Sequence, residues 1–320
     1  MTDNILPHVN LAAEEFLTTH AKEGEVSLML WQNAPCVVIG KNQNPWRECN
    51  VERMKADGVT LVRRISGGGA VYHDVGNLNF TFIARDDLYD VARQTEVILQ
   101  AVRLLGIDAR KTGRNDLTID ERKFSGHAYY SHGGYNYHHG TIMIDVVADD
   151  LQKYLNVSAD KLKSKGVSSV RSRVVNLKEH LPDITVEAVK TAMIMAFEMV
   201  YGGEAVEGRF PVVTAYPDMT PLVIKYQSDE WTYGTKIPFE TSLEKRFDWG
   251  SCEVQLAMKG GHISECKIYS DCLDTELLPI VEASLIGTNY DAKTILSLKD
   301  SLPSSNIVED VIELIASSIN

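Results

Sequence analysis

The sequence is short of the features that mark secreted and membrane-spanning proteins. No run of apolar residues approaches the roughly 20 that are needed to cross a bilayer. Residues 1–4 lack the basic and apolar regions that begin a signal peptide. Only five cysteines occur, an odd number without a CxxC pair, which is typical of reduced thiols rather than of a disulfide framework. We therefore expect a cytoplasmic protein without a membrane anchor.

Positive charge is also scarce, with 32 Lys and Arg against 44 Asp and Glu and a formal net charge of −12. Such a balance argues against a general nucleic-acid-binding protein, which needs a basic surface. Residues 151–178 depart from the average, because they hold seven basic residues and a single acid, Asp160. This basic segment predicts a site for an anionic ligand or an acidic partner, and the alternative is a solvated positive face. Its basic residues are Lys153, Lys161, Lys163, Lys165, Arg171, Arg173 and Lys178.

The spacing of apolar residues predicts a mixed α+β fold rather than repeated βαβ units. A length of 320 residues favours one large domain plus a smaller one. Residues 77–83 alternate polar and apolar side chains, as a half-buried strand does. Helices are expected over residues 9–22, 51–57, 95–105 and 185–201, and strands over 26–30, 36–39, 59–65, 77–83 and 139–146.

A second unit is expected from residue 243 onward. Its pattern predicts a strand, a Lys-Gly-Gly turn and a second strand, followed by helices near 274–286 and 306–319. We therefore assign residues 1–242 to a large domain and residues 243–320 to a small α+β accessory domain.

Residues 63–74 (RRISGGGAVYHD) are the most informative segment. Three consecutive glycines let a ligand approach the backbone, where several N–H groups can converge on an anion. The two preceding arginines supply permanent charge suited to phosphate or carboxylate. The segment is neither a Walker A loop nor a dinucleotide fingerprint. A glycine-rich bend with two surface arginines is the structural alternative.

Two further segments combine small residues with cations. In the first, Lys123 precedes a Ser-Gly pair that can present its ammonium to a pocket, and Asn115 or Asp116 can contact a metal-bridged phosphate or an adenine edge. The second, residues 165–174, joins glycine, hydroxyls and cations in a loop that can close over an anion. A solvated lysine and a flexible basic linker are the respective alternatives.

Taken in order, these segments resemble the motifs of the lipoate–protein ligase A family. The similar stretches are RRISGGGAVYHDVGNLNFTFI, GRNDL, RKFSGHAYY, HHGTIMIDV, KYLN and KGVSSVRSRVVNL, together with NQNPW at residues 42–46. The match is strong over about residues 9–180 and looser over 243–320. The resemblance implies the biotin/lipoate ligase fold with a C-terminal accessory domain. It also implies an ATP-dependent enzyme that makes lipoyl-AMP, releases pyrophosphate and transfers the lipoyl group to a lysine.

The resemblance also assigns roles to individual residues. Lys123 corresponds to the catalytic lysine, which contacts the lipoate carboxylate and the α-phosphate and offsets their charge. Mg²⁺ is expected with the phosphates, with no metal held by the protein alone. The implied ATP contacts are Arg64, Gly69, Ala70, Val71, Tyr72 and Lys123; those to lipoate are Lys123, Gly68, Trp31 and Val38; those of the adenylate loop are Lys165, Gly166, Ser168, Arg171 and Arg173; and Asn115 and Asp116 are candidate phosphate or Mg²⁺ contacts.

Three rival functions are weaker. A metal hydrolase is suggested by His127, His132, His138 and His139, but their spacing fits no tetrahedral zinc pattern. An octanoyltransferase on the same fold needs a cysteine acyl-enzyme, and no cysteine lies between residues 63 and 178. A module that only binds lipoate or an adenylate fits the full set of loops poorly.

The resemblance implies protein acceptors as well. These are the apo lipoyl domains of 2-oxoacid dehydrogenase E2 subunits and the glycine-cleavage H protein. We expect a monomer that engages neither nucleic acid nor membrane.

Overall fold

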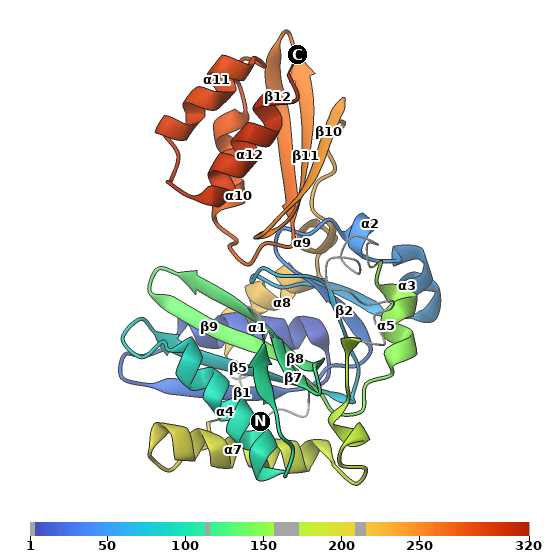
Figure 1. Cartoon of the computed structure of the whole chain (residues 1–320), viewed down its shortest axis with the longest axis vertical. Coiled ribbons are helices and arrows are strands. Elements are labelled where there is room, and N and C mark those ends of the chain that lie inside the picture. Colours follow the sequence, from blue (N-terminus) through green and yellow to red (C-terminus); the bar gives the residue numbers. More distant parts are fainter. Residues whose placement is uncertain (1–3, 113–115, 157–172, 209–215, 320) are drawn as a thin grey trace. The chain divides into compact units, whose positions relative to one another are not determined.

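The computed structural model describes residues 4–112, 116–156, 173–208 and 216–319. The chain divides into two compact units (Figure 1). The first comprises Met1–Val38, Trp46–Arg63 and Val71–Thr232, and the second comprises Ile39–Pro45, Arg64–Ala70 and Tyr233–Asn320. The domain boundary predicted after residue 242 falls within strand β10 (Thr241–Phe247) and remains a prediction about which part folds independently.

A six-stranded antiparallel sheet forms the centre of the first unit. Its strand order is β1-β5-β9-β8-β7-β6. The strands are β1 (Val26–Trp31), β5 (Asn77–Arg85), β9 (Tyr135–Met143), β8 (Arg122–His132), β7 (Asp116–Ile119) and β6 (Arg110–Thr112). Strand β5 is buried along nearly its whole length. The prediction of a half-buried strand was therefore wrong: its polar side chains Asn77, Asn79 and Thr81 are covered rather than solvated.

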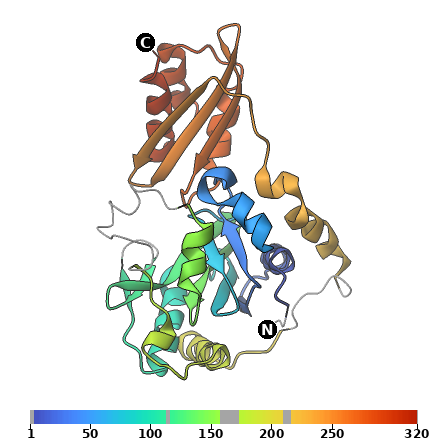
Figure 2. The same ribbon diagram turned by 90° about the vertical axis from the view of Figure 1, so that its right-hand side faces the viewer.

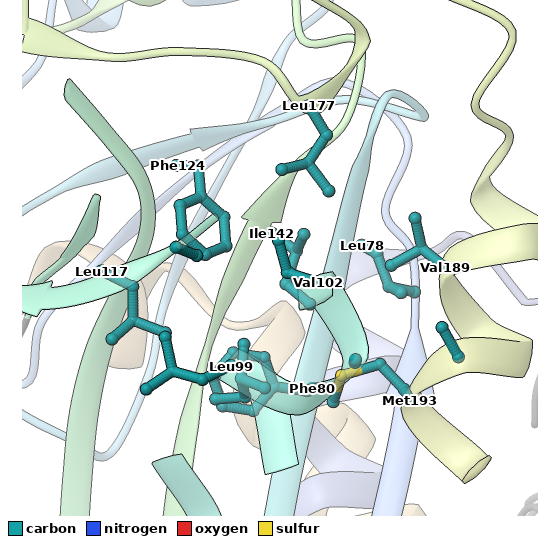
Figure 3. Close-up of a cluster of buried hydrophobic side chains, with 14 of the residues drawn as sticks. Leu78, Phe80, Leu99, Val102, Leu117, Phe124, Ile142, Leu177, Val189 and Met193 are labelled. Atoms are coloured by element: carbon teal, nitrogen blue, oxygen red, sulfur yellow. The ribbon is translucent and has the colours of Figure 1, made fainter. Parts of the chain in front are cut away.

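Helices cover both faces of this sheet. Helix α1 (Pro7–Thr19) lies on the face that carries Thr81 and His139, since Glu14 accepts hydrogen bonds there. Helices α4 (Val91–Leu104) and α7 (Val186–Tyr201) pack together on the other face. That second face buries the apolar core of the unit, which includes Leu78, Phe80, Phe124 and Met193 (Figure 3).

The helix ends follow from local sequence. Asp90 accepts a hydrogen bond from the Arg93 N–H and so caps the start of α4. Thr185 caps α7 in the same way, and Gly202 ends that helix with a φ of 73°. Gly58, with a φ of 71°, ends helix α3 (Val51–Asp57) as predicted.

A smaller described sheet has the strand order β3-β2-β4. It contains β2 (Cys36–Ile39), β3 (Thr60–Arg63) and β4 (Val71–His73). The expected strands 26–30 and 36–39 both exist, but they belong to different sheets. Further helices among the described residues of this region are α2 (Pro45–Glu48), α5 (Ala148–Tyr154), α8 (Thr220–Gln227) and α9 (Asp229–Tyr233).

The C-terminal module is a three-stranded sheet with helices against one side (Figure 2). Strands β11 (Gly250–Lys259) and β12 (His262–Ser270) turn at Gly260 and Gly261, whose φ angles of 62° and 82° favour glycine. Helices α10 (Leu277–Leu285), α11 (Ala292–Ser297) and α12 (Asn306–Ala316) follow. The predicted α+β fold with a small α+β C-terminal module is confirmed, although β10 and α11 were not predicted. Among the described residues, no helix is both long and apolar enough to cross a membrane.

Candidate active site

Lys123 lies near the start of strand β8, where an extra residue interrupts the pairing with β7. Lys123 pairs with Thr118, but the next pair joins Ser125 to Leu117, so Phe124 has no partner of its own. Phe124 and Ser125 consequently both face the α4 and α7 side, where each is fully buried. This β-bulge turns Lys123 to the opposite face of the sheet, as bulges beside functional sites commonly do.

Asp116 and Gly126 hold the Lys123 ammonium in place. The Nζ atom lies 2.6 Å from Asp116 Oδ1, and both side chains are partly shielded from water. A Cβ atom added at Gly126 would lie 2.5 Å from Nζ, so this glycine leaves the space that the ammonium occupies. Lys123 is thus part of a strand, and Asp116 contacts this lysine.

A row of residues leads from this ammonium across the sheet. Asp116 on β7 is paired with Gly126 on β8, and the Gly126 N–H donates to Thr141 Oγ1 on β9 at 3.3 Å. Thr141 is paired with Asn79 on β5, and Asn79 is paired with Trp31 on β1. The row therefore runs over β7, β8, β9, β5 and β1 on one face. Three strand spacings of about 4.8 Å place Trp31 roughly 14 Å from Gly126.

Hydrogen bonds fix Trp31 at the end of this row that is farther from Lys123. The Trp31 indole donates to Thr81 Oγ1 at 3.0 Å, and Thr81 donates to Glu14 Oε1 at 2.6 Å. His139 Nδ1 lies 2.8 Å from the same oxygen. Sequence reasoning missed Glu14, Thr81 and Asn79. Glu14 lies within a predicted amphipathic helix, and the available signal was the repeated polar side chain in residues 77–81.

Val38 lies in β2, in the smaller sheet, paired with Val71. Trp31 and Val38 are both 2% exposed. The predicted roles of these two residues toward lipoate stay predictions.

The glycine segment, residues 64–70, belongs to the second unit. Arg64 is buried, and its guanidinium donates to Ser66 Oγ at 2.9 Å, Gly67 O at 2.7 Å and Gly69 O at 2.8 Å. This arginine thereby holds the shape of the loop. Arg63, in the first unit, donates to the Thr232 carbonyl at 2.8 Å.

The C-terminal module contacts the glycine segment directly. The Gly68 N–H donates to the Cys272 carbonyl at 3.0 Å. A Cβ atom at Gly67 would lie 2.2 Å from the same carbonyl oxygen, and Gly68 has a φ of 86°. Lys41 Nζ also lies 2.8 Å from Glu276 Oε1. Contacts between segments about 200 residues apart have no signal in the local sequence.

Val71 and Tyr72 follow the glycines on β4 in the first unit. Tyr72 is buried, and its hydroxyl donates to Asp150 Oδ2 at 3.4 Å. Burial and the nearby carboxylates Asp74 and Asp150 raise the pKa of Tyr72, so its hydroxyl stays protonated. Asp74 accepts hydrogen bonds from the Gly76 and Val147 N–H groups, yet burial raises its pKa.

Much of the basic segment lies outside the described residues. These undescribed predictions are Asn115 and the adenylate-loop residues Lys165, Gly166, Ser168 and Arg171. The chain resumes at Arg173, and the Val175 N–H donates to the Lys123 carbonyl at 2.9 Å, so the returning segment runs beside the candidate lysine. Lys153 and Lys178 are ion-paired with Asp57 and Asp145, each at 2.5 Å.

Two histidines form a buried chain behind the row. Ser125 Oγ lies 3.1 Å from His127 Nε2, His127 Nδ1 lies 2.9 Å from His138 Nε2, and His138 Nδ1 lies 3.1 Å from Gln94 Oε1. Burial lowers the pKa of His127 to about 3 and lowers that of His138 well below its usual value. The imidazoles are therefore neutral and bonded to one another.

None of the five cysteines is exposed. Burial raises the pKa of Cys49, Cys252 and Cys266 to about 12 and also raises that of Cys36. Because the thiolate is the nucleophile, these four are poorly suited to form an acyl-enzyme.

Comparisons with known proteins match both parts of the chain. Residues 6–198 match the lipoyl protein ligase A/B catalytic domain, and residues 236–315 match the bacterial lipoate protein ligase C-terminus. A lipoate-protein ligase A of Psychrobacter cryohalolentis is 38% identical over 303 residues, which cover 92% of this chain and 89% of the relative.

Solved structures agree with these matches. The lipoate complex of Plasmodium falciparum LipL1 has a TM-score of 0.86 and 30% identity, covering 98% of this chain and 97% of that one. A lipoate-protein ligase A bound with ATP has a TM-score of 0.64 and 26% identity, covering 72% and 94%.

Proposed function

The chain belongs to the lipoyl protein ligase A/B family, and from that membership we propose that it activates lipoate with ATP and transfers the lipoyl group to an acceptor lysine. In the first step a lipoate carboxylate oxygen attacks the α-phosphorus of ATP, and the bond to the β-phosphate breaks to release pyrophosphate. In the second step the lysine amine attacks the acyl carbon of lipoyl-AMP, loses a proton and expels AMP.

The position of Lys123 carries this proposal. Its ammonium is fixed by Asp116 and by the space above Gly126, at one end of the row. A preorganised cation there offsets the charge of two anions brought together, which lowers the barrier without the lysine acting as a nucleophile. The ammonium is compact and carries several N–H donors, so from one position it can contact a carboxylate and a phosphate together.

The dimensions of the row suit a lipoyl chain. From carboxyl carbon to the last ring carbon, an extended lipoate spans about 9 Å, judged from ordinary single-bond lengths. A contact of about 3 Å to the ammonium extends this to about 12 Å. The row offers roughly 14 Å between Gly126 and Trp31. We place the acyl chain along it, with the dithiolane ring toward the indole.

The glycine segment supplies the implied ATP contacts Arg64, Gly69 and Ala70, and Val71 and Tyr72 follow on β4. Since Arg64 already fixes three loop groups, its first role in our proposal is to shape the backbone that meets the nucleotide. Within the second unit, Cys272 lies directly against Gly67 and Gly68, so the C-terminal module helps to hold the loop that carries these implied ATP contacts.

Asp116 does not fit the candidate role of a Mg²⁺ ligand. Its carboxylate is bound to the Lys123 ammonium, and a second cation at the same group would be repelled. Mg²⁺ is commonly held largely by substrate phosphates and water. We therefore assign Asp116 to the orientation of Lys123.

The acceptors in this proposal are lipoyl domains of E2 subunits and the H protein. The basic segment remains the proposed meeting point for such acidic partners, although two of its lysines are already paired with Asp57 and Asp145. Acceptor choice depends on complementary charge more than on the row itself.

The decisive experiment combines the protein with lipoate, ATP, Mg²⁺ and an apo lipoyl domain. Mass spectrometry of the domain should show the mass of one lipoyl group, and pyrophosphate should be released even without the domain. The domain with its acceptor lysine changed to arginine is the matched control. Lipoate binding without pyrophosphate release would instead indicate a module that only binds lipoate.

A further inference from the structure

Asn79 lies in the row between Thr141 and Trp31 and is 1% exposed. Its Oδ1 atom accepts a hydrogen bond from Asn77 Nδ2 at 2.9 Å. Within the described part of the chain, its Nδ2 atom has no hydrogen-bond partner. Buried polar groups are nearly always paired, so an unpaired amide in a candidate binding row calls for a partner that is not part of the protein.

The neighbours of Asn79 leave its donor facing the proposed acyl path. Its cross-strand partners on this face are Trp31 and Thr141. The Trp31 indole is committed to Thr81, and Thr141 Oγ1 accepts from the Gly126 N–H. These two neighbouring groups have thus found protein partners, whereas the Asn79 N–H group has not.

The distance along the row identifies the part of the substrate that meets Asn79. Two strand spacings of about 4.8 Å separate Asn79 from Gly126, which gives roughly 10 Å. The carboxylate takes up about 3 Å of this at the ammonium. Five extended single bonds from the carboxyl carbon to the first ring carbon take up about 6 Å more. The dithiolane ring, not the methylene chain, therefore reaches Asn79.

Building on the proposed function, we propose that Asn79 is a specificity-determining residue that donates a hydrogen bond to a dithiolane sulfur. Sulfur is a weak acceptor, but it is the only acceptor that lipoate has at this end. Octanoate has the same number of carbon atoms and no sulfur, so it would shield the Asn79 N–H group from water without accepting a hydrogen bond from it. A binding site discriminates against a ligand that leaves one of the site's buried donors without a hydrogen bond. Asn79 thus favours lipoate over octanoate.

Asn79→Leu tests this inference, because it removes the donor while keeping the branching and the number of heavy atoms of the side chain. We expect the lipoate-to-octanoate ratio of kcat/KM, measured by pyrophosphate release, to fall about 3- to 10-fold, mainly through weaker lipoate binding and better octanoate binding. Calorimetric titration of both acids without ATP should give the same change in the ratio of Kd values. Asn136→Leu is the matched control, because Asn136 is also 1% exposed but bonds Asp86 away from the row.

Asn79→Ala is a second variant in case the leucine disturbs folding. Its smaller side chain weakens both acids alike through lost packing, so the ratio still reports the hydrogen bond. An unchanged ratio in both Asn79 variants would overturn the inference, as would an equal loss for both acids. Failure of the proposed function is a separate result, in which the wild-type protein releases no pyrophosphate with either acid.

Discussion

The Nζ atom of Lys123 lies 2.6 Å from Oδ1 of Asp116, and the two side chains share a face of the sheet because β8 holds an extra residue at Phe124. The ammonium is thereby fixed before any substrate arrives. Preorganisation of this kind is what electrostatic catalysis requires, since no reorganisation is then needed during the reaction.

Lys123→Ala should lower the rate of pyrophosphate release by about 100-fold or more, because it removes this fixed charge. Thermal unfolding should change little, because the lysine side chain lies outside the apolar core. Lys267→Ala is a matched control: Lys267 and Glu282 are exposed to 33% and 16%, against 30% and 17% for Lys123 and Asp116. Near-wild-type turnover by Lys123→Ala would remove this residue from the mechanism.

Asp116→Asn should slow adenylation about 10-fold, because the ammonium loses its charged anchor while the shape of the site is kept. The Mg²⁺ concentration for half-maximal rate should stay the same. If excess Mg²⁺ restores the rate instead, Asp116 is a metal ligand and its assignment to Lys123 fails.

Gly126→Ala should impair adenylation at least 10-fold while leaving the protein equally stable or slightly more stable. The new methyl group meets chiefly the end of the Lys123 side chain, so the backbone can remain while the ammonium is displaced from Asp116. Replacing glycine where the backbone suits alanine usually stabilises by about 0.4–1 kcal/mol. Gly203→Ala, which meets open space, serves as the control. Activity that survives unchanged in Gly126→Ala would show that the position of Nζ is not critical.

Gly67→Ala should behave differently, because its methyl group meets the Cys272 carbonyl rather than a flexible tip. We expect a loss of about 1–3 kcal/mol in the free energy of unfolding, measured by urea denaturation, as the two backbones separate. ATP-dependent pyrophosphate release should fall as well. A stable and fully active Gly67→Ala protein would refute the contribution of the Cys272 segment to the ATP site.

The free energy of unfolding should fall as the pH is lowered below about 6.5. His127, with a folded pKa of about 3, and His138, whose pKa is also lowered, stay neutral in the fold, whereas their unfolded imidazoles take up protons. Between the folded and the unfolded pKa, each such histidine lowers the free energy of unfolding by about 1.4 kcal/mol for each pH unit of acidification. Above the unfolded pKa of about 6.5 neither state takes up the proton, so the free energy of unfolding no longer changes. His127→Ala should therefore flatten the curve of stability against pH, measured by urea unfolding at pH 7, 6 and 5. The exposed His262→Ala is the control, and parallel curves for wild type and His127→Ala would contradict the account.

Local sequence predicted the helices α1, α3, α4 and α7, because capping residues and apolar spacing act over a few positions, whereas α2, α5, α8 and α9 were not predicted. Asn50, Asp90 and Thr185 each cap a helix near the expected start, and Gly58 ends one. Strand partners were not accessible in this way, since pairing depends on distant residues. The strands before and after residues 32–35 consequently joined different sheets.

The candidate site was predictable only in part for the same reason. Lys123 and the glycine segment are contiguous motifs, so their chemistry is visible in the sequence. Asn79 and Glu14 belong to the site only through residues that are distant in the sequence and lie beside them in the fold. The alternating polarity of residues 77–83 gave no sign that helix α1 would cover the polar side of this strand. The contact of Gly68 with Cys272 depends on a module about 200 residues away.

The bulge at Phe124 decides which face of the sheet carries the Lys123 side chain. Side chains of a regular strand alternate between odd and even positions, and Lys123 shares the face of Gly126 although one residue number is odd and the other even. If Phe124 were paired in register instead of bulged, Lys123 would turn into the apolar core, whereas deleting Phe124 would leave a regular strand with Lys123 still on the face of Gly126. The position of the bulge in β8, and not only the presence of a lysine, thus decides which face of the sheet carries the ammonium.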